Sequence, residues 1–173
     1  RSQISLLPSV GATAAAFTQA NTRVDDHLRR RVAQWAEPAG RRVLELHAGV
    51  GNFTSALAAG AAAVTVVESS PEGARQLRSN TKEMPHVRVM ERSAEAALAR
   101  LAADGERFDV VVMDPPREGC RGLGPALAQT GATCLVYVSC DPMILARDLE
   151  ELRGLGFVAE EVEPLDMMPQ TFH

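Results

Sequence analysis

Short runs rich in valine and leucine recur along this chain, and each is separated from the next by a stretch with the apolar spacing of a helix. Parallel strands need a crossover of a dozen or more residues between them, usually a helix, and such crossovers are right-handed. The pattern therefore predicts a doubly wound, mostly parallel α/β sheet. The expected strands cover residues 43–46, 64–68, 87–90, 110–113, 135–138 and 157–162.

Length and aromatic content agree with that architecture. Aromatic residues make up only 4% of the chain, so the core must consist of Ala, Val and Leu, which suits helices on a parallel sheet. A chain of 173 residues fits one domain, which we expect over residues 21–173. Residues 1–20 contain Pro8 and Gly11 and predict a linker or docking segment. Because the chain opens with Arg1 rather than Met, we expect a fragment of something longer.

Charge and cysteine content restrict the partners and the compartment. The net charge of −4 argues against strong attraction of nucleic acid by the whole surface. Three cysteines without CxxC spacing predict neither a disulfide framework nor a zinc site, which favours the reducing cytoplasm and no metal. The longest weakly polar run, residues 56–67, is too short to span a bilayer, so no membrane association is expected.

A glycine loop follows the first expected strand. Gly49 and Gly51 would let a ligand approach the backbone at the start of a helix. Glu68 ends the next strand, where a carboxylate can accept hydrogen bonds from both hydroxyls of a ribose. A dinucleotide fingerprint would need a third glycine near Thr54, and none is there. The loop therefore favours S-adenosyl-L-methionine over NAD, and methyl transfer over hydride transfer.

Cys140 lies where an apolar strand gives way to a helix. Asp141 and Pro142 follow it, and Pro142 is well placed as the first helical residue. The unpaired N–H groups and positive dipole of a helix N-terminus favour a thiolate. The sequence thus predicts a nucleophilic cysteine at the same edge of the sheet as the glycine loop.

A second strand end carries Asp114 and two prolines, which make a rigid turn. Amino-group methyltransferases have an aromatic residue after such a turn, to stack on a flipped base. Arg117 stands in that place here, so a phosphate or carbonyl contact is expected instead.

These motifs together resemble the RNA uracil-5-methyltransferases, which methylate C5 of a uridine in tRNA or rRNA with S-adenosyl-L-methionine. The resemblance covers most of the chain and rests on five segments in order: Phe17-x-Gln19-x-Asn21, Gly49-x-Gly51-Asn52-Phe53-Thr54, Asp114-Pro115-Pro116-Arg117-x-Gly119, Val138-Ser139-Cys140-Asp141-Pro142 continuing to Leu149, and Asp166 to His173. It implies a Rossmann-like class I methyltransferase fold, with a catalytic domain over residues 21–173.

The resemblance also implies roles for individual residues. Cys140 would be the nucleophile that adds to C6 of the uracil, and Arg117 would lie near the target base. The cofactor would be bound by Gln19, His47, Gly49, Gly51, Asn52, Glu68, Ser93 and Asp114. The general base of the family would lie beyond His173, as would the last strand, usually antiparallel. Domains that recognise tRNA or rRNA, and in some members hold an iron–sulfur cluster, would precede Arg1, and the protein is expected to be a monomer.

Departures from the family pattern leave two alternatives open. An aromatic residue is common at the place of His47, and an acid or amide at that of Ser93. An RNA cytosine-5-methyltransferase would also use a cysteine at this strand end, but with a further cysteine where Arg117 stands. A catalytically idle cofactor-binding or RNA-binding module is the other alternative, because the base is missing and the surface is acidic.

Several residues have simpler structural interpretations. Cys120 and Cys134 are expected to be packing residues. For the arginines at 29–31, a solvated helix face and a phosphate contact are equally compatible with the sequence.

Overall fold

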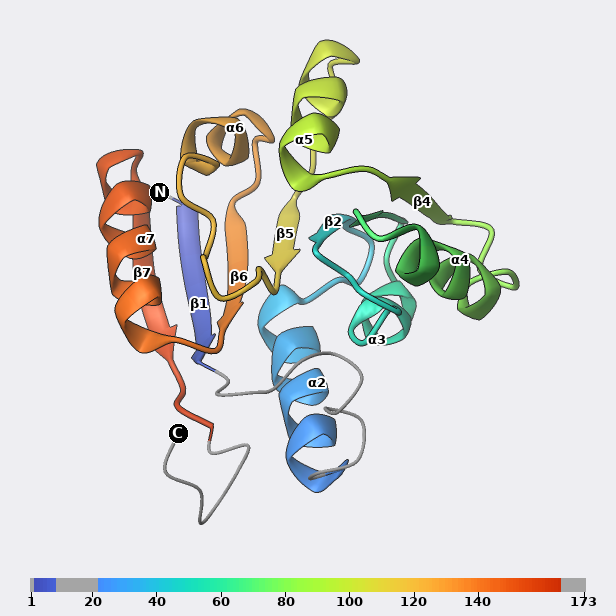
Figure 1. Ribbon diagram of the computed structural model, residues 1–173, viewed down its shortest axis with the longest axis horizontal. Helices are drawn as coiled ribbons and strands as arrows, with labels where there is room; N and C mark the ends of the chain where they lie inside the picture. Colours follow the sequence, from blue (N-terminus) through green and yellow to red (C-terminus); the bar gives the residue numbers. More distant parts are fainter. Residues whose placement is uncertain (1, 9–21, 166–173) are drawn as a thin grey trace.

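A seven-stranded sheet forms the centre of the computed structural model, which describes residues 2–8 and 22–165 (Figure 1). The strand order is β4-β3-β2-β5-β6-β1-β7, and all neighbouring strands are parallel. The strands are β1 (Ser2–Pro8), β2 (Arg42–Leu46), β3 (Ala63–Glu68), β4 (Val87–Glu91), β5 (Val110–Met113), β6 (Cys134–Ser139) and β7 (Phe157–Val162). The six expected strands are confirmed, each within one residue of its predicted ends, and so is the doubly wound α/β class.

Strand β1 corrects the expectation of a linker over residues 1–20. Residues 2–8 form a strand between β6 and β7, paired from Gln3 opposite Cys134 to Pro8 opposite Ser139. Pro8 was read as a break, but it is the last residue of the strand, where the missing N–H disturbs the ladder least. Residues 9–20 lie outside the described part of the chain.

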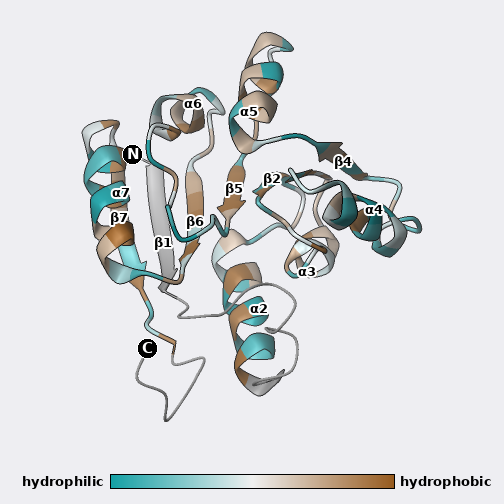
Figure 2. Ribbon diagram, viewed as in Figure 1, coloured by the Kyte–Doolittle hydropathy of each residue, from teal (hydrophilic) through white to brown (hydrophobic). Residues whose placement is uncertain are grey.

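Helices cover both faces of the sheet, and the strands β2, β3, β5 and β6 between them are almost wholly buried. They are α2 (Thr22–Ala36), α3 (Thr54–Ala58), α4 (Pro71–Asn80), α5 (Ala94–Ala103), α6 (Gly124–Gln129) and α7 (Pro142–Gly154). Apolar residues of α2, α3 and α4 pack on one face in a cluster with Val43 and Val112, and those of α5, α6 and α7 pack on the other with Leu44 and Met113. Figure 2 shows the apolar strands at the centre and hydrophilic residues on the outer helix surfaces.

Helix α2 is held to β7 and to the residue that follows it by ion pairs and a hydrogen bond. His27 and Arg31 both pair with Glu163, and the indole N–H of Trp35 donates to Glu161 at 2.8 Å. Arg29 pairs with Asp25 within the helix. Two of the three arginines at 29–31 are therefore engaged within the protein, which supports their structural interpretation.

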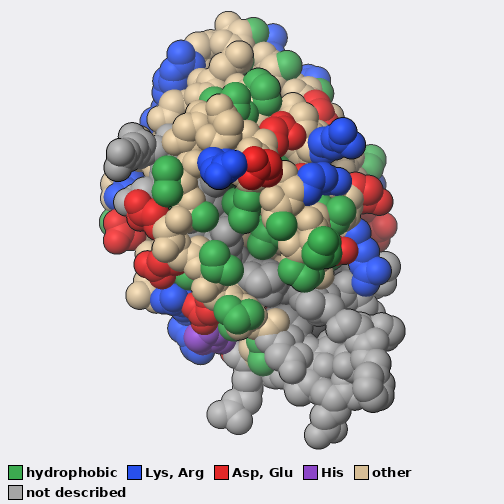
Figure 3. Space-filling view, turned by 90° about the vertical axis from the view of Figure 1, so that its left-hand side faces the viewer, with side chains coloured by type: hydrophobic (Ala, Val, Ile, Leu, Met, Phe, Trp, Pro, Cys, Tyr) green, Lys and Arg blue, Asp and Glu red, His purple; other side chains and the backbone are tan. Residues whose placement is uncertain are grey.

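The surface beside α7 and β7 mixes charges of both signs. Figure 3 looks onto this side and shows acidic and basic side chains interspersed, with no large area of a single sign. This agrees with the net charge of −4. Among the described residues, no helix has the length and apolarity needed to cross a membrane.

We predict that Leu44→Ala lowers the free energy of unfolding by about 2–5 kcal/mol, since Leu44 is 0% exposed and its removal leaves a cavity under α5. Denaturant unfolding measures the change. Val158→Ala is the control, because Val158 is 48% exposed and its loss should cost under about 0.5 kcal/mol. Equal losses in the two variants would contradict this account of the core.

Candidate functional site

The candidate site lies at the edge where the carboxyl ends of the parallel strands meet. The glycine loop follows β2, Glu68 ends β3, Asp114 follows β5, and Cys140 follows β6. Because β3, β2, β5 and β6 are consecutive neighbours in the sheet, these groups lie along one continuous edge.

Glu68 fixes the conformation of the glycine loop. Its carboxylate accepts a hydrogen bond from the Gly49 N–H at 2.7 Å and another from the Ser70 N–H at 2.6 Å. Gly51 has a φ of +94°, and a Cβ there would come within 2.6 Å of a methyl group of Leu77. The loop therefore needs glycine at 51 for its backbone and for its approach to α4. Carboxylate lone pairs of Glu68 that these two bonds do not use can still accept from a ribose.

His47 is the first residue of the loop and has a φ of +60°, in the left-handed region. Its Nε2 is buried and has no hydrogen-bond partner within residues 22–165. Burial lowers the pKa of His47, against the smaller opposing influence of Glu95 and Glu68. The imidazole is therefore neutral at physiological pH, with one ring nitrogen free to bind a ligand.

Other expected cofactor residues have structural partners. The Asn52 side-chain amide donates to Asp25 on α2 at 3.1 Å. Ser93 is the N-cap of α5, and its hydroxyl accepts from the Ala96 N–H at 3.2 Å. Gln19 lies outside the described residues.

Glu45 is a buried acid that sequence reasoning missed. It is 1% exposed on β2, where the Thr54 hydroxyl donates to Oε2 at 2.7 Å and Oε1 has no partner among the described residues. Burial, with a smaller contribution from the charge of Asp114, raises its pKa to about 8 against the opposing effect of the Thr54 hydrogen bond. Burial also raises the pKa of Asp114, to about 7. The sequence held one signal for this buried acid, namely a carboxylate between the apolar residues of an expected strand.

Cys140 is partly exposed at the end of β6 and lies near both Asp114 and Arg117. Burial raises the pKa of its thiol, Asp114 and Asp141 raise it further, and the Arg117 guanidinium lowers it. The net effect is a raised pKa, so the expectation that the helix N-terminus makes Cys140 a thiolate is wrong. Asp141 caps α7 and accepts from the N–H groups of Met143 and Ile144 at 2.8 and 3.2 Å, so those donors are occupied.

The other two cysteines have the packing roles expected for them. Cys120 and Cys134 are buried, and burial raises the pKa of Cys120 to about 12 and that of Cys134 above its usual value. Neither thiol ionises readily, so Cys140 is the accessible cysteine of this protein.

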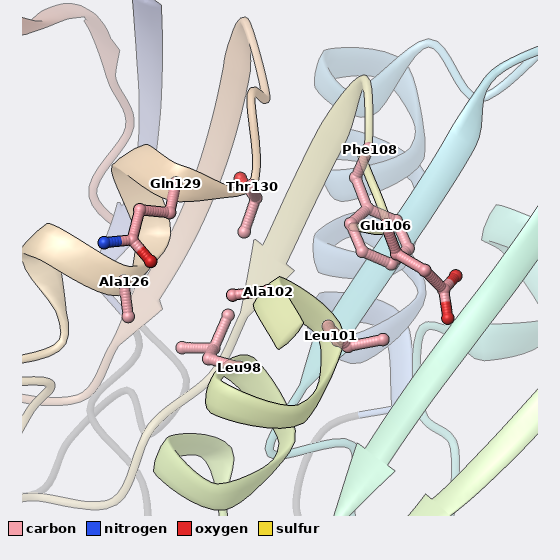
Figure 4. Close-up of a pocket in the computed structure, with 8 residues that line it drawn as sticks. All are labelled: Leu98, Leu101, Ala102, Glu106, Phe108, Ala126, Gln129 and Thr130. Carbon is pink, nitrogen blue, oxygen red and sulfur yellow. The ribbon is translucent and has the colours of Figure 1, made fainter. Parts of the chain in front are cut away.

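A hollow elsewhere on the protein lies away from these groups (Figure 4). It lies between the carboxyl ends of α5 and α6, beside residues that precede β5 and β6, and therefore at the opposite edge of the sheet. Its lining is Leu98, Leu101, Ala102, Glu106, Phe108, Ala126, Gln129 and Thr130. None of the groups along the edge that carries Cys140 lines this hollow.

The raised pKa of Glu45 makes stability depend on pH. The pKa of Glu45 in the folded protein, about 8, exceeds its ordinary value of 4.5. The stabilisation that Glu45 contributes is therefore complete below pH 4.5 and is lost as the pH rises through 8. We therefore compare the free energy of unfolding of Glu45→Gln with that of the parent at two pH values. We predict that this difference favours the variant by at least about 1 kcal/mol more at about pH 8.5 than at about pH 5.5. Denaturant unfolding at both pH values measures this. The exposed Glu72→Gln is the control, and identical pH trends in parent and Glu45→Gln would contradict the burial of a protonated acid.

Comparison with known proteins agrees with this geometry. The chain is 40% identical over 166 residues to the 23S rRNA (uracil(1939)-C(5))-methyltransferase RlmD of Chromohalobacter salexigens, covering 95% of this chain and 34% of that protein. It is 36% identical to the protein of the same name from Vibrio cholerae, covering 99% of this chain and 38% of that protein. The chain thus spans somewhat more than a third of the length of these curated relatives.

A solved structure supports the fold. The tRNA (uracil-54, C5)-methyltransferase of Pyrococcus abyssi, in complex with S-adenosyl-L-homocysteine, superposes with a TM-score of 0.60 at 28% identity, covering 76% of this chain and 32% of that one. The Rossmann-like methyltransferase fold is confirmed. A family described as conserved hypothetical protein 95 matches residues 17–129. The chain therefore belongs to that family, and its relationship to the RNA uracil-5-methyltransferases, predicted from its motifs, is confirmed.

Proposed function

We propose that this protein transfers a methyl group from S-adenosyl-L-methionine to C5 of a uridine in ribosomal RNA, through a covalent bond between Cys140 and C6 of the base. The observation that carries the proposal is the shared edge of the sheet, which brings an accessible thiol, Arg117 and Asp114 next to the glycine loop and Glu68. The names of the relatives from C. salexigens and V. cholerae support uridine in 23S rRNA as the substrate.

The residues of the glycine loop fit S-adenosyl-L-methionine. Apart from Gly49 itself and its two chain neighbours, no heavy atom of the described residues lies within 4 Å of the position that a Cβ would take at Gly49, so a ligand can approach the backbone there. The free Nε2 of His47 and the remaining lone pairs of Glu68 offer polar contacts for the adenosine part. When bound, the cofactor supplies an electrophilic methyl group on sulfur.

Cys140 supplies the chemistry that uracil lacks. C5 of uracil is a poor nucleophile, but addition of the thiolate to C6 forms a C–S bond and an enolate, whose electrons make C5 nucleophilic. After C5 has gained the methyl group, a base removes the C5 proton, the C5–C6 double bond re-forms, and the C6–S bond breaks to release Cys140 as a thiolate. The location of this base beyond His173 stays a prediction.

Arg117 and Asp114 favour the addition of Cys140 to the uracil ring. The guanidinium lowers the pKa of a thiol that burial raises, so it favours the reactive form. Asp114 has a pKa of about 7, so it can accept a hydrogen bond from a ring N–H when ionised or donate one to a carbonyl when protonated. Both groups therefore suit a uracil ring beside Cys140.

We predict that Cys140→Ala lowers methyl transfer at least about a thousandfold and leaves binding of S-adenosyl-L-homocysteine unchanged, because the variant loses the nucleophile alone. Radiolabelled methyl transfer to unmodified rRNA and calorimetry measure the two effects. Cys134→Ala is the matched control and should retain activity. Turnover by Cys140→Ala would refute the covalent step, and 5-methylcytidine in place of 5-methyluridine would identify a cytosine enzyme.

Glu68→Gln should weaken binding of S-adenosyl-L-homocysteine about tenfold to a hundredfold. Gly49 and Ser70 donate to different oxygens of the Glu68 carboxylate, and glutamine replaces one of these oxygens with an NH2 donor. One of the two hydrogen bonds is therefore lost, and the glycine loop is less well supported. Calorimetry gives the affinity, and Glu72→Gln in the first turn of α4 is the control. Unchanged affinity would show that Glu68 has no part in the cofactor site, whereas no binding by the parent would argue for a module without this cofactor.

A further inference from the structure

Asp148, on α7, is a buried carboxylate outside the residues assigned so far. It is 1% exposed. One oxygen accepts hydrogen bonds from the Cys120 N–H at 2.8 Å and the Tyr137 hydroxyl at 2.7 Å, and the other accepts from the guanidinium of Arg147 at 2.6 and 2.9 Å. A buried carboxylate with this many donors is fully hydrogen-bonded.

The carboxylate is ionised in spite of its burial. Burial by itself would raise its pKa, but the hydrogen bonds from Cys120, Tyr137 and Arg147 outweigh this and leave the pKa below its usual value. An ionised acceptor makes stronger hydrogen bonds than a neutral one, so the three donors are held firmly.

The donors come from the two chain segments that carry the reactive groups. Tyr137 is on β6, three residues before Cys140, and Cys120 is three residues after Arg117 in the loop between β5 and α6 (Figure 1). One side chain of α7 therefore fixes both the strand that ends at the thiol and the loop that carries the guanidinium.

Neighbouring contacts extend this attachment along the loop. Arg147 donates to the Glu118 carbonyl at 2.7 Å, and Glu151, one turn further along α7, accepts from the N–H groups of Gly122 and Gly124. A Cβ at Gly119 would lie 2.2 Å from the Asp148 carboxylate, so the loop lies directly against α7. Arg117 itself is exposed and has no hydrogen bond or ion pair within residues 22–165, so its place depends on the backbone of this loop.

We infer that Asp148 is a positioning residue that holds the loop of residues 117–124 against α7, so that the Arg117 guanidinium stays beside the Cys140 thiol. Its consequence for methyl transfer rests on the function proposed above. The position of Arg117 relative to the thiol does not depend on that function, and it can be tested without RNA or cofactor.

The test is the pH dependence of Cys140 alkylation by iodoacetamide, followed by mass spectrometry of the peptide that contains Cys140. The charged groups that act on this thiol are Arg117, Asp114 and Asp141. We expect Asp148→Asn to raise the apparent pKa of Cys140 by about half a unit or more, which slows alkylation near pH 8 about threefold. Glu150→Gln, which removes an exposed charge from the same helix, should leave the profile unchanged.

The sign of the shift separates positioning from a direct effect of charge. Removal of a negative charge alone would lower the pKa of a nearby thiol, so a rise requires that Arg117 has moved away. Arg117→Gln should also raise the pKa of Cys140. In a protein that already carries Arg117→Gln, Asp148→Asn should cause no further rise in this pKa, because both changes act through the same guanidinium.

Gly119→Ala provides a second, uncharged test that does not depend on the folding of Asp148→Asn. Its Cβ displaces the loop from α7, so it should also raise the pKa of Cys140. The inference is overturned by an unchanged or lower pKa in Asp148→Asn, by an unchanged pKa in Arg117→Gln, or, if Asp148→Asn does not fold, by an unchanged pKa in Gly119→Ala. Loss of methyl transfer in Cys140→Ala has no bearing on these profiles, so the two proposals fail separately.

Discussion

The uniform direction of the strands is the constraint on which the site depends. In a parallel sheet, every strand delivers the residue after its carboxyl end to the same edge, so groups from residues 47–52, 68, 114 and 140 meet although the chain between them is long. The strands that deliver them are almost wholly buried, and all residues of β5 and β6 are buried. The reactive groups are thus attached to the most rigid part of the molecule, as a preorganised site requires.

Burial is the main reason that the Cys140 thiol stays protonated. Burial, Asp114 and Asp141 raise the pKa of Cys140, and Arg117 opposes them. A thiol reacts with oxidants mainly as the thiolate, so the raised pKa protects this accessible cysteine from oxidation. The position of Arg117 therefore sets the reactive fraction of the thiol, and a loop that moved freely could not set it reproducibly.

Sequence reasoning succeeded where a local pattern decides the structure. Strands buried on both faces must be apolar, so β2, β3, β5 and β6 could be predicted from short apolar runs, and β4 and β7 from their place in the alternation of strands and helices. It failed where tertiary contacts decide. Asp148 reads as one more acid on an amphipathic helix, and its burial becomes evident only when Tyr137 and the loop at Cys120 are brought against α7. Likewise, Asp141 could be recognised as the start of a helix, but not as the group that takes the donors expected to stabilise Cys140.

Buried carboxylates in this protein differ in charge because they differ in the number of their donors. Asp148 and Glu45 are both 1% exposed, yet the pKa of Asp148 is lowered and that of Glu45 is raised to about 8. Asp148 accepts from Cys120, Tyr137 and Arg147. Among the described residues, Glu45 accepts only from Thr54, and it has a neighbouring acid in Asp114. The first is therefore a fixed charge that orders the chain around it, and the second holds a proton at neutral pH. Two acids of equal burial thus have pKa values shifted in opposite directions. Neither the residue type nor the exposure of these acids determines the direction of the shift.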